Sequence, residues 1–247
     1  MAEDSRPGCL ITRPEPGAGA TAERVAALGW RPVLAPALVL TPLPMRPAPA
    51  AQAALVPSAA SLPALATAWP LGRPLLAVGE ATAATARHLG FAQVIAADGD
   101  AESLAATAAA RLDPRDGPLL LAAGRGYGTA LAAAVQARGF GVIRRTAYAA
   151  TPAAALPEEA CAALASGTVR AGLFLSPRSA SVACALLRGA GLAGAATGIR
   201  AVALSARVAR ALADLPWRSL DASPRPDQDA LLTMLGPPPE RGPSPPP

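Results

Sequence analysis

Short apolar runs alternate with alanine-rich segments along most of the chain. The runs have the length of buried strands, and many of the segments between them have helical spacing and end at glycine. Strands are predicted at Cys9–Thr12, Trp30–Leu34, Ala53–Val56, Leu75–Val78, Val94–Ala96, Leu119–Ala122, Gly141–Ala147 with Tyr148 at its end, and Leu173–Leu175. Regular alternation of strand and helix predicts an α/β fold.

The stretch Ala171–Leu187 contains the clearest strand-to-helix corner. Its apolar run stops at Ser176, a favourable helix N-cap, and proline follows at the first helical position. Ser176 and Ser179 are therefore expected at the mouth of a parallel sheet. Backbone N–H groups and the helix dipole make such a corner suitable for a carboxylate or phosphate. The alternative is an ordinary capped helix without a ligand.

An internal repeat divides the chain into four pieces. Leu10–Trp30 aligns with Leu120–Phe140 at a constant offset of 110 residues. Leu55–Leu65 aligns with the segment that begins at Leu173, including the serines of both corners, and Leu76–Ala83 aligns with Val202–Ala209. The pieces form two related α/β units, but the repeat leaves open which pieces pair. Ligands of such sheets bind at the carboxyl ends of the strands.

Prolines mark the two segments that interrupt this pattern. Five prolines between Pro36 and Pro49 predict an extended connection that crosses between domains. The proline-rich tail 236–247 has no pattern of helix or strand, and we expect it to be disordered.

The composition restricts the classes of ligand. Hydrophobic residues make up 52% of the chain, and all 22 basic residues are arginine, giving a net charge of +5. Residues 170–218 contain seven arginines and one acid. A solvated arginine face and attraction of a polyanion both fit this run, and the charge also raises nucleic acid as a third hypothesis.

Several other classes are disfavoured. The three cysteines lack metal-ligand spacing, so neither a disulfide framework nor a metal site is predicted, and the compartment is expected to be reducing. Without a signal or membrane segment, we expect a cytoplasmic protein that does not bind membranes. His88 is a surface helix residue without a triad partner, and the glycine-rich turn 124–128 lacks the full nucleotide-binding spacing.

Several motifs in their order and spacing closely resemble the uroporphyrinogen-III synthase family. They are ITRPEPGA from Ile11, VGEATA from Val78, DGDAESL from Asp98, the strand ending in Tyr148, and FLSPRS from Phe174. The resemblance runs to about Leu235 and implies two flavodoxin-like α/β lobes with parallel sheets, joined by a two-stranded linker. It implies a discontinuous first lobe at 1–36 and 152–235, a second lobe at 50–147, and a linker at 37–49 and 148–151.

The resemblance also implies an activity. The family converts the linear tetrapyrrole hydroxymethylbilane to uroporphyrinogen III, losing water and inverting ring D through a spiro intermediate, in haem biosynthesis. No cofactor or metal is expected, and the protein is expected to be a monomer that does not bind nucleic acid. The substrate carries eight carboxylates, which hydroxyls, arginines and helix N-termini around an interlobe cleft would recognise.

The family's functional positions can be carried over to this chain. Tyr148 is the candidate proton donor to the leaving hydroxyl, because a phenol is protonated at neutral pH. A tyrosine that only fills the strand end is the alternative. The candidate substrate-binding residues are Thr12, Arg13, Ser58, Ser61, Thr82, Ser176, Arg178, Ser179 and Ser205.

Two departures from the family pattern and one alternative function remain. Where the family usually has a glycine followed by threonines, this chain has Leu204–Ala209, in which only Ser205 carries a hydroxyl. Where the family often has Thr-Ser before a helix, this chain has Pro57–Ser58. Both weaken the individual site assignments. A two-lobed protein that binds an anionic ligand without catalysis is the alternative to the enzyme.

Overall fold

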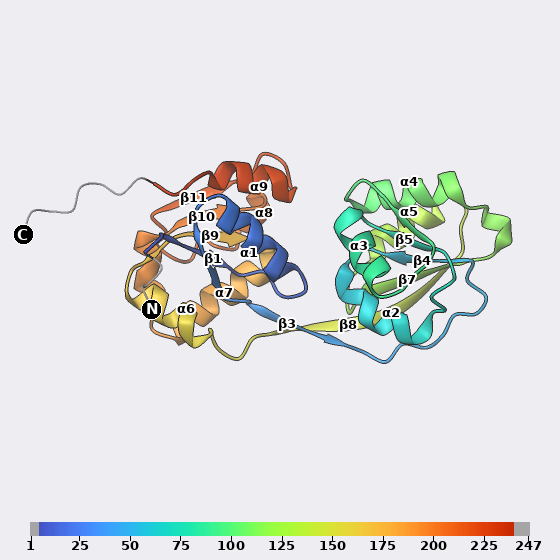
Figure 1. Ribbon diagram of the computed structural model, residues 1–247, viewed down its shortest axis with the longest axis horizontal. Helices are drawn as coiled ribbons and strands as arrows, with labels where there is room; N and C mark the ends of the chain where they lie inside the picture. Colours follow the sequence, from blue (N-terminus) through green and yellow to red (C-terminus); the bar gives the residue numbers. More distant parts are fainter. Residues whose placement is uncertain (1–4, 240–247) are drawn as a thin grey trace, which may run out of the picture. The chain divides into compact units, whose positions relative to one another are not determined.

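The computed structural model describes residues 5–239 and contains two compact units (Figure 1). Unit 1 comprises Met1–Val39 and Pro152–Pro247, and unit 2 comprises Leu40–Thr151. Each unit is built around its own sheet. The discontinuous α/β architecture expected from the sequence is confirmed.

Unit 1 has a five-stranded parallel sheet in the order β11-β10-β9-β1-β2. Its elements are β1 (Gly8–Ile11), α1 (Gly17–Ala27), β2 (Arg31–Leu34), α6 (Glu158–Ala165), β9 (Val169–Phe174), α7 (Pro177–Gly189), η3 (Ala193–Gly198), β10 (Arg200–Ala203), α8 (Ala206–Arg210), β11 (Ser219–Ala222) and α9 (Gln228–Leu235).

Alternate residues of the unit 1 strands face opposite sides of the sheet, as the period of a strand requires. On one side, Leu10 and Phe174 pack against helices α6, α7 and α8. On the other, Ile11 and Leu173 pack against α1 and α9. Because both faces are covered, the central strand β1 is buried and apolar throughout and appears as a continuous apolar run in the sequence, whereas the edge strands β2 and β11 are partly exposed and include Arg31 and Asp221.

Unit 2 contains a six-stranded sheet in the order β3-β8-β7-β4-β5-β6. Its elements are β3 (Leu38–Pro42), β4 (Ala53–Val56), η1 (Ala59–Ser61), α2 (Leu62–Ala68), β5 (Leu75–Ala77), α3 (Glu80–His88), β6 (Val94–Ala96), α4 (Ala101–Arg111), η2 (Pro114–Asp116), β7 (Leu119–Gly124), α5 (Thr129–Gln136) and β8 (Val142–Pro152). Helices α2 and α3 cover one face, and α4 and α5 cover the other.

The sheet order confirms the internal repeat. Strands β9, β10, β11, β1 and β2 of unit 1 correspond to β4, β5, β6, β7 and β8 of unit 2 in the same spatial arrangement. Each sheet therefore combines one piece from each half of the repeat. Sequence alignment left this pairing open, because it compares pieces without showing which of them share a sheet.

Strand β8 is longer than the residue pattern predicts and pairs with β3, in agreement with the two-stranded linker that the family resemblance implies. It was expected to end at Tyr148 but continues to Pro152 beside β3. The Leu43 N–H donates to the Ala147 carbonyl at 2.9 Å, and the Ala153 N–H donates to the Ala37 carbonyl at 2.9 Å. The two bonds give an antiparallel pair, because residue numbers rise along one strand as they fall along the other. This pairing allows the chain to continue as a strand beyond the tyrosine.

The first residues of the predicted disordered tail make specific contacts. The indole N–H of Trp30 donates to the Gly236 carbonyl at 2.8 Å. Pro238 lies next to Gly29, whose φ of +93° favours glycine. The tail is therefore anchored at its start, whereas its residues 240–247 lie outside the described part of the chain.

Candidate active site

The carboxyl ends of the parallel strands carry the candidate residues in both units. A strand that ends there leads into a turn and the N-terminus of the next helix. Hydroxyl, guanidinium and backbone N–H groups thus gather at one edge of each sheet.

Tyr148 is the central residue of the unit 2 group. It pairs with Gly124 where β7 ends, and the register shifts by a bulge between Ala123 and Gly124. A Cβ at Gly124 would lie 2.6 Å from Tyr148 Cζ and 2.9 Å from its hydroxyl oxygen. Glycine at this position therefore gives the phenol ring the space to lie directly against the end of β7.

Burial raises the pKa of the Tyr148 phenol, and a side-chain hydrogen bond with Ser58 acts in the opposite direction. Ser58 follows β4 and also accepts the Ala60 N–H at 3.3 Å as a helix cap. The structure thus brings together two residues that are 90 positions apart in the sequence. The phenol is held in its protonated form at neutral pH and beside a second hydroxyl.

Ser61 and Thr82 lie on neighbouring elements of the same edge. The buried Ser61 hydroxyl donates to the Ala122 carbonyl at 2.8 Å, which ties the corner after β4 to β7. Thr82 is 8% exposed in the first turn of α3. Both side chains were candidate substrate-binding residues, but both are buried.

Two helices at this edge begin without a side-chain cap. Gly79 precedes α3 and Gly128 precedes α5, and neither residue can supply a side-chain acceptor. By contrast, Asp100 caps α4 in a complete capping box. The first turns of α3 and α5 therefore present backbone N–H groups that can donate hydrogen bonds to an anion. The positive end of each helix dipole also favours an anion there.

In unit 1, the Thr12 hydroxyl is inaccessible. Thr12 is fully buried and donates to the Leu173 carbonyl at 2.9 Å, which joins the end of β1 to β9. The sequence analysis expected this hydroxyl at the first turn. Its position is as predicted, but its hydrogen bond is internal.

Arg13 lies over the start of helix α1. A Cβ at Gly17 would be 2.2 Å from its Nε, so the guanidinium packs directly on that glycine. Its Nη1 donates to Gln228 Oε1 at 2.9 Å and to Thr21 Oγ1 at 3.4 Å. Burial lowers the pKa of Arg13, and the nearby charge of Glu15 opposes this shift. The hydrogen bonds of the Arg13 guanidinium to Gln228 and Thr21 are therefore bonds to neutral side chains.

The serines of unit 1 are helix caps. Ser176 Oγ accepts the Ser179 N–H at 3.1 Å and lies 2.6 Å from Ser179 Oγ. Ser205 Oγ accepts the Val208 N–H at 3.4 Å at the start of α8. Ser176 is thus the N-cap that its sequence context predicts, followed by proline. Arg178, in the same turn, is exposed.

Sequence reasoning missed two features of the unit 2 edge. Gly124 determines where the Tyr148 ring lies, and Arg125 follows it, with its N–H bonded to the Tyr148 carbonyl at 2.8 Å. From the sequence alone, the glycines of this turn indicate at most a weak nucleotide-binding loop. The internal repeat was the available signal, because the turn after β7 corresponds to the Thr12–Arg13 turn after β1.

The remaining candidate chemistry is limited. Within residues 5–239, no three His, Cys, Asp or Glu side chains are grouped as metal ligands, and no helix is both long and apolar enough to cross a membrane. His88 is exposed at the end of α3, as expected. Cys9 and Cys184 are buried free cysteines, and burial raises both thiol pKa values, that of Cys184 to about 11.

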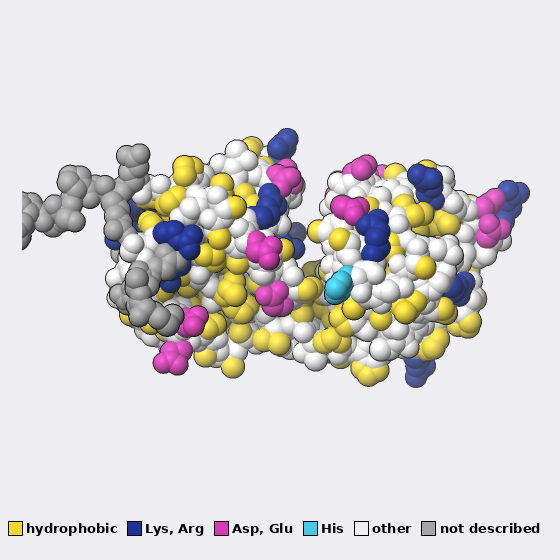
Figure 2. All heavy atoms as spheres, in the orientation of Figure 1, with side chains coloured by type: hydrophobic (Ala, Val, Ile, Leu, Met, Phe, Trp, Pro, Cys, Tyr) yellow, Lys and Arg dark blue, Asp and Glu magenta, His cyan; other side chains and the backbone are white. Residues whose placement is uncertain are grey.

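Two of the seven arginines in the arginine-rich stretch 170–218 form ion pairs with acids. Arg188 pairs with Asp214, and Arg200 pairs with Asp221 at 2.7 Å. On the face of unit 2 visible in Figure 2, acidic side chains lie beside basic ones. Mixed charge of this kind differs from the continuous basic stripe typical of nucleic-acid-binding surfaces.

Fold and site together define a class of two-unit α/β proteins with hydroxyl and cationic groups at the carboxyl edges of their sheets. The family model of uroporphyrinogen-III synthase HemD matches residues 19–233. The chain belongs to the uroporphyrinogen-III synthase family. It is accordingly an enzyme of tetrapyrrole biosynthesis, with its function in haem formation.

Solved structures of similar fold include members of the same family. Uroporphyrinogen-III synthetase from Helicobacter pylori 26695 is 13% identical, with a TM-score of 0.57 over 93% of this chain and 98% of that chain. A mutant uroporphyrinogen III synthase from the extremely thermophilic bacterium Thermus thermophilus is 20% identical, with a TM-score of 0.46 over 92% and 95%. The first likeness supports the fold. No curated protein matches in a sequence search.

Proposed function

We propose that this protein cyclises hydroxymethylbilane to uroporphyrinogen III, with loss of water and inversion of ring D through a spiro intermediate. The observation that carries the proposal is the Tyr148 phenol, which lies on Gly124 and interacts with the Ser58 hydroxyl, in a chain of this family. The reaction makes the protein a cyclising hydro-lyase.

Tyr148 assists departure of the substrate hydroxyl. As the C–O bond of the hydroxymethyl group breaks, the phenol gives its proton to the departing oxygen, which leaves as water. The proton released when the terminal pyrrole carbon forms the new C–C bond returns the phenolate to a phenol. Because burial raises the Tyr148 pKa, the phenol keeps its proton until the C–O bond breaks, and the phenolate then readily takes a proton back. The bond with Ser58 offsets part of the cost of negative charge on the phenol oxygen.

Recognition of the substrate carboxylates relies on cations and helix N-termini. The uncapped starts of α3 and α5 offer backbone N–H groups beside Tyr148 on the same sheet edge. Arg125 adds an exposed guanidinium next to them. In unit 1, Arg13 and Arg178 are the proposed cationic contacts. Charge-assisted hydrogen bonds of this kind are about twice as strong as neutral ones.

The hydroxyls fall into two roles in this proposal. Ser58, Ser176 and Ser205 are partly exposed, and each can donate its proton to a carboxylate while its oxygen caps a helix. Thr12 and Ser61 are buried and bonded to backbone carbonyls, so we assign them a positioning role. Thr82 and Ser179 are nearly buried and support the turns from which the N–H groups project.

We further propose a cytoplasmic monomer that works without a cofactor. The two buried free thiols suit a reducing compartment. Binding of an anion without catalysis is the competing function, supported by the same cationic groups. Retention on DNA that falls steeply with salt would instead support nucleic-acid binding.

The product isomer distinguishes these functions. Hydroxymethylbilane closes spontaneously to isomer I, so the purified protein should replace isomer I by isomer III in proportion to the protein added. An anion-binding protein would leave the isomer ratio unchanged. That result, together with stoichiometric binding of the substrate, would overturn the proposed reaction.

A further inference from the structure

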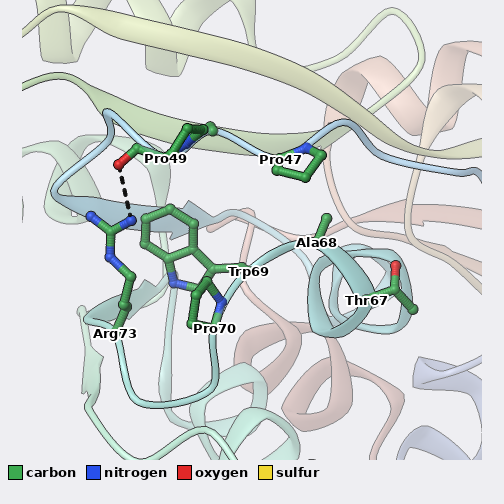
Figure 3. A pocket seen from close by; sticks show the side chains of 8 residues that line it. Pro47, Pro49, Thr67, Ala68, Trp69, Pro70 and Arg73 are labelled. Atoms are coloured by element: carbon green, nitrogen blue, oxygen red, sulfur yellow. Dashed lines mark hydrogen bonds between the residues drawn. The ribbon is translucent and has the colours of Figure 1, made fainter.

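A cavity of about 430 Å³ lies at the edge of unit 2 opposite to Tyr148. Its lining residues come from segments that precede strands β4 and β5, so they lie at the amino edge of the parallel sheet. They are Pro47, Ala48, Pro49, Thr67, Ala68, Trp69, Pro70 and Arg73 (Figure 3). Its volume is within the range of small-molecule sites. The site proposed for catalysis lies at the carboxyl edge and shares none of these residues.

The cavity is mostly apolar but contains one cation. The Arg73 guanidinium carbon lies 4.3 Å from the centroid of the Trp69 ring. The Nη1 of Arg73 donates to the Pro49 carbonyl at 3.2 Å, and the Nη2 of Arg73 donates to the Ala51 carbonyl. Among the described residues, no carboxylate pairs with this arginine. A guanidinium has five N–H donors, so further donors remain for a ligand.

The lining contains a second polar group, the Trp69 indole nitrogen, which, unlike Arg73, has no hydrogen-bond acceptor among the described residues. This Nε1 atom is buried. The indole nitrogens of Trp30 and Trp217, in contrast, each donate to a carbonyl at 2.8 Å. A buried donor without an acceptor is uncommon in folded proteins, and ligand oxygens or bound water frequently satisfy it.

We propose that this cavity binds a small amphipathic carboxylate. The apolar body would pack on Pro47, Ala68 and Trp69, and the carboxylate would accept hydrogen bonds from Arg73. The guanidinium supplies the charge that selects an anion, and the proline and indole surfaces supply the apolar contact. This site is independent of the proposed cyclisation, because it uses other residues at the opposite edge of the sheet.

The proposal is tested with 4-phenylbutyrate as the probe and ¹⁵N-labelled full-length protein. The three tryptophans give three indole signals, and Trp69→Phe identifies that of Trp69. The probe should shift the Trp69 signal saturably and leave those of Trp30 and Trp217 in place. The neutral amide 4-phenylbutyramide should bind at least about tenfold more weakly, because it lacks the charge.

Three variants separate the charge from the cavity. Arg73→Gln should weaken 4-phenylbutyrate binding at least about tenfold and abolish its preference over the amide. Ala68→Phe should block both probes, because the Ala68 methyl points toward Pro47 across the cavity (Figure 3). Arg111→Gln, at an exposed arginine of the same unit, should bind as wild type. The Trp30 and Trp217 signals report whether each variant is folded.

Two results would overturn the proposal. One is no saturable shift of the Trp69 signal in the wild-type protein. The other is equal binding of the acid and the amide, with Arg73→Gln unchanged, which would indicate a non-selective apolar surface. If folded Ala68→Phe still binds the probe, the ligand lies elsewhere and the assignment to this cavity is wrong.

Discussion

Gly124→Ala is expected to reduce turnover through Tyr148 without altering any polar group. The new Cβ would lie 2.6 Å from Tyr148 Cζ and 2.7 Å from Cε2. Ordinary carbon contacts are about 3.5–4.0 Å, so the ring must move by about 1 Å. That displacement would disrupt the hydrogen bond to Ser58. A misplacement of about 1 Å can lower a rate about a hundredfold, and overpacking costs about 1–3 kcal/mol of stability.

The assay measures the rate of isomer III formation and the midpoint of urea unfolding for the same preparations. Gly72→Ala is the matched control in unit 2, because its added Cβ would have no neighbour within 4 Å. The control should retain wild-type turnover and stability. If folded Gly124→Ala keeps full turnover, or if Gly72→Ala loses as much, the position of the Tyr148 ring does not control the reaction.

Four further predictions concern three individual side chains. Tyr148→Phe should lower turnover about tenfold to a hundredfold in steady-state kinetics, and unchanged turnover would make the phenol a packing residue. Because burial raises its pKa, Tyr148 stays protonated, so a pH profile should show no loss of turnover attributable to it below about pH 10. An alkaline loss at lower pH that disappears in Tyr148→Phe would contradict this. Thr12→Val should cost about 1–3 kcal/mol in denaturant unfolding, because the Leu173 carbonyl loses its donor, while turnover of the folded fraction is retained. Cys184, with its thiol pKa at about 11, should be labelled by a thiol reagent at pH 8 about a hundredfold more slowly than free cysteine, as measured by mass spectrometry; labelling at the rate of free cysteine would contradict burial of the thiol.

Much of the fold followed from the sequence because the central parallel strands are covered on both faces. Continuous apolar runs such as Ala53–Val56 then indicate strands directly, and Ser176 with Pro177 marks the start of a helix. The path of β8 beyond Tyr148 could not be predicted in this way. Its continuation depends on pairing with β3, more than 100 residues earlier in the chain, and local pattern carries no information about that partner.

The candidate site was predictable in position more than in contact. Strand ends identified Thr12, Ser58 and Ser61 as residues of the carboxyl edges. Whether each hydroxyl faces the ligand or a backbone carbonyl depends on neighbouring strands, as the bond from Ser61 to Ala122 illustrates. The role of Gly124 was likewise hidden, because only the register of β7 and β8 brings it beneath Tyr148.

The central claim is that this protein catalyses formation of the inverted isomer at a site containing Tyr148. The most direct measurement is the initial rate of uroporphyrinogen III formation from hydroxymethylbilane as a function of protein concentration, with Tyr148→Phe measured in parallel. We predict a rate proportional to wild-type protein, with isomer I suppressed, and a clearly lower slope for the variant. An isomer I fraction that stays at its protein-free value at every protein concentration would contradict the claim.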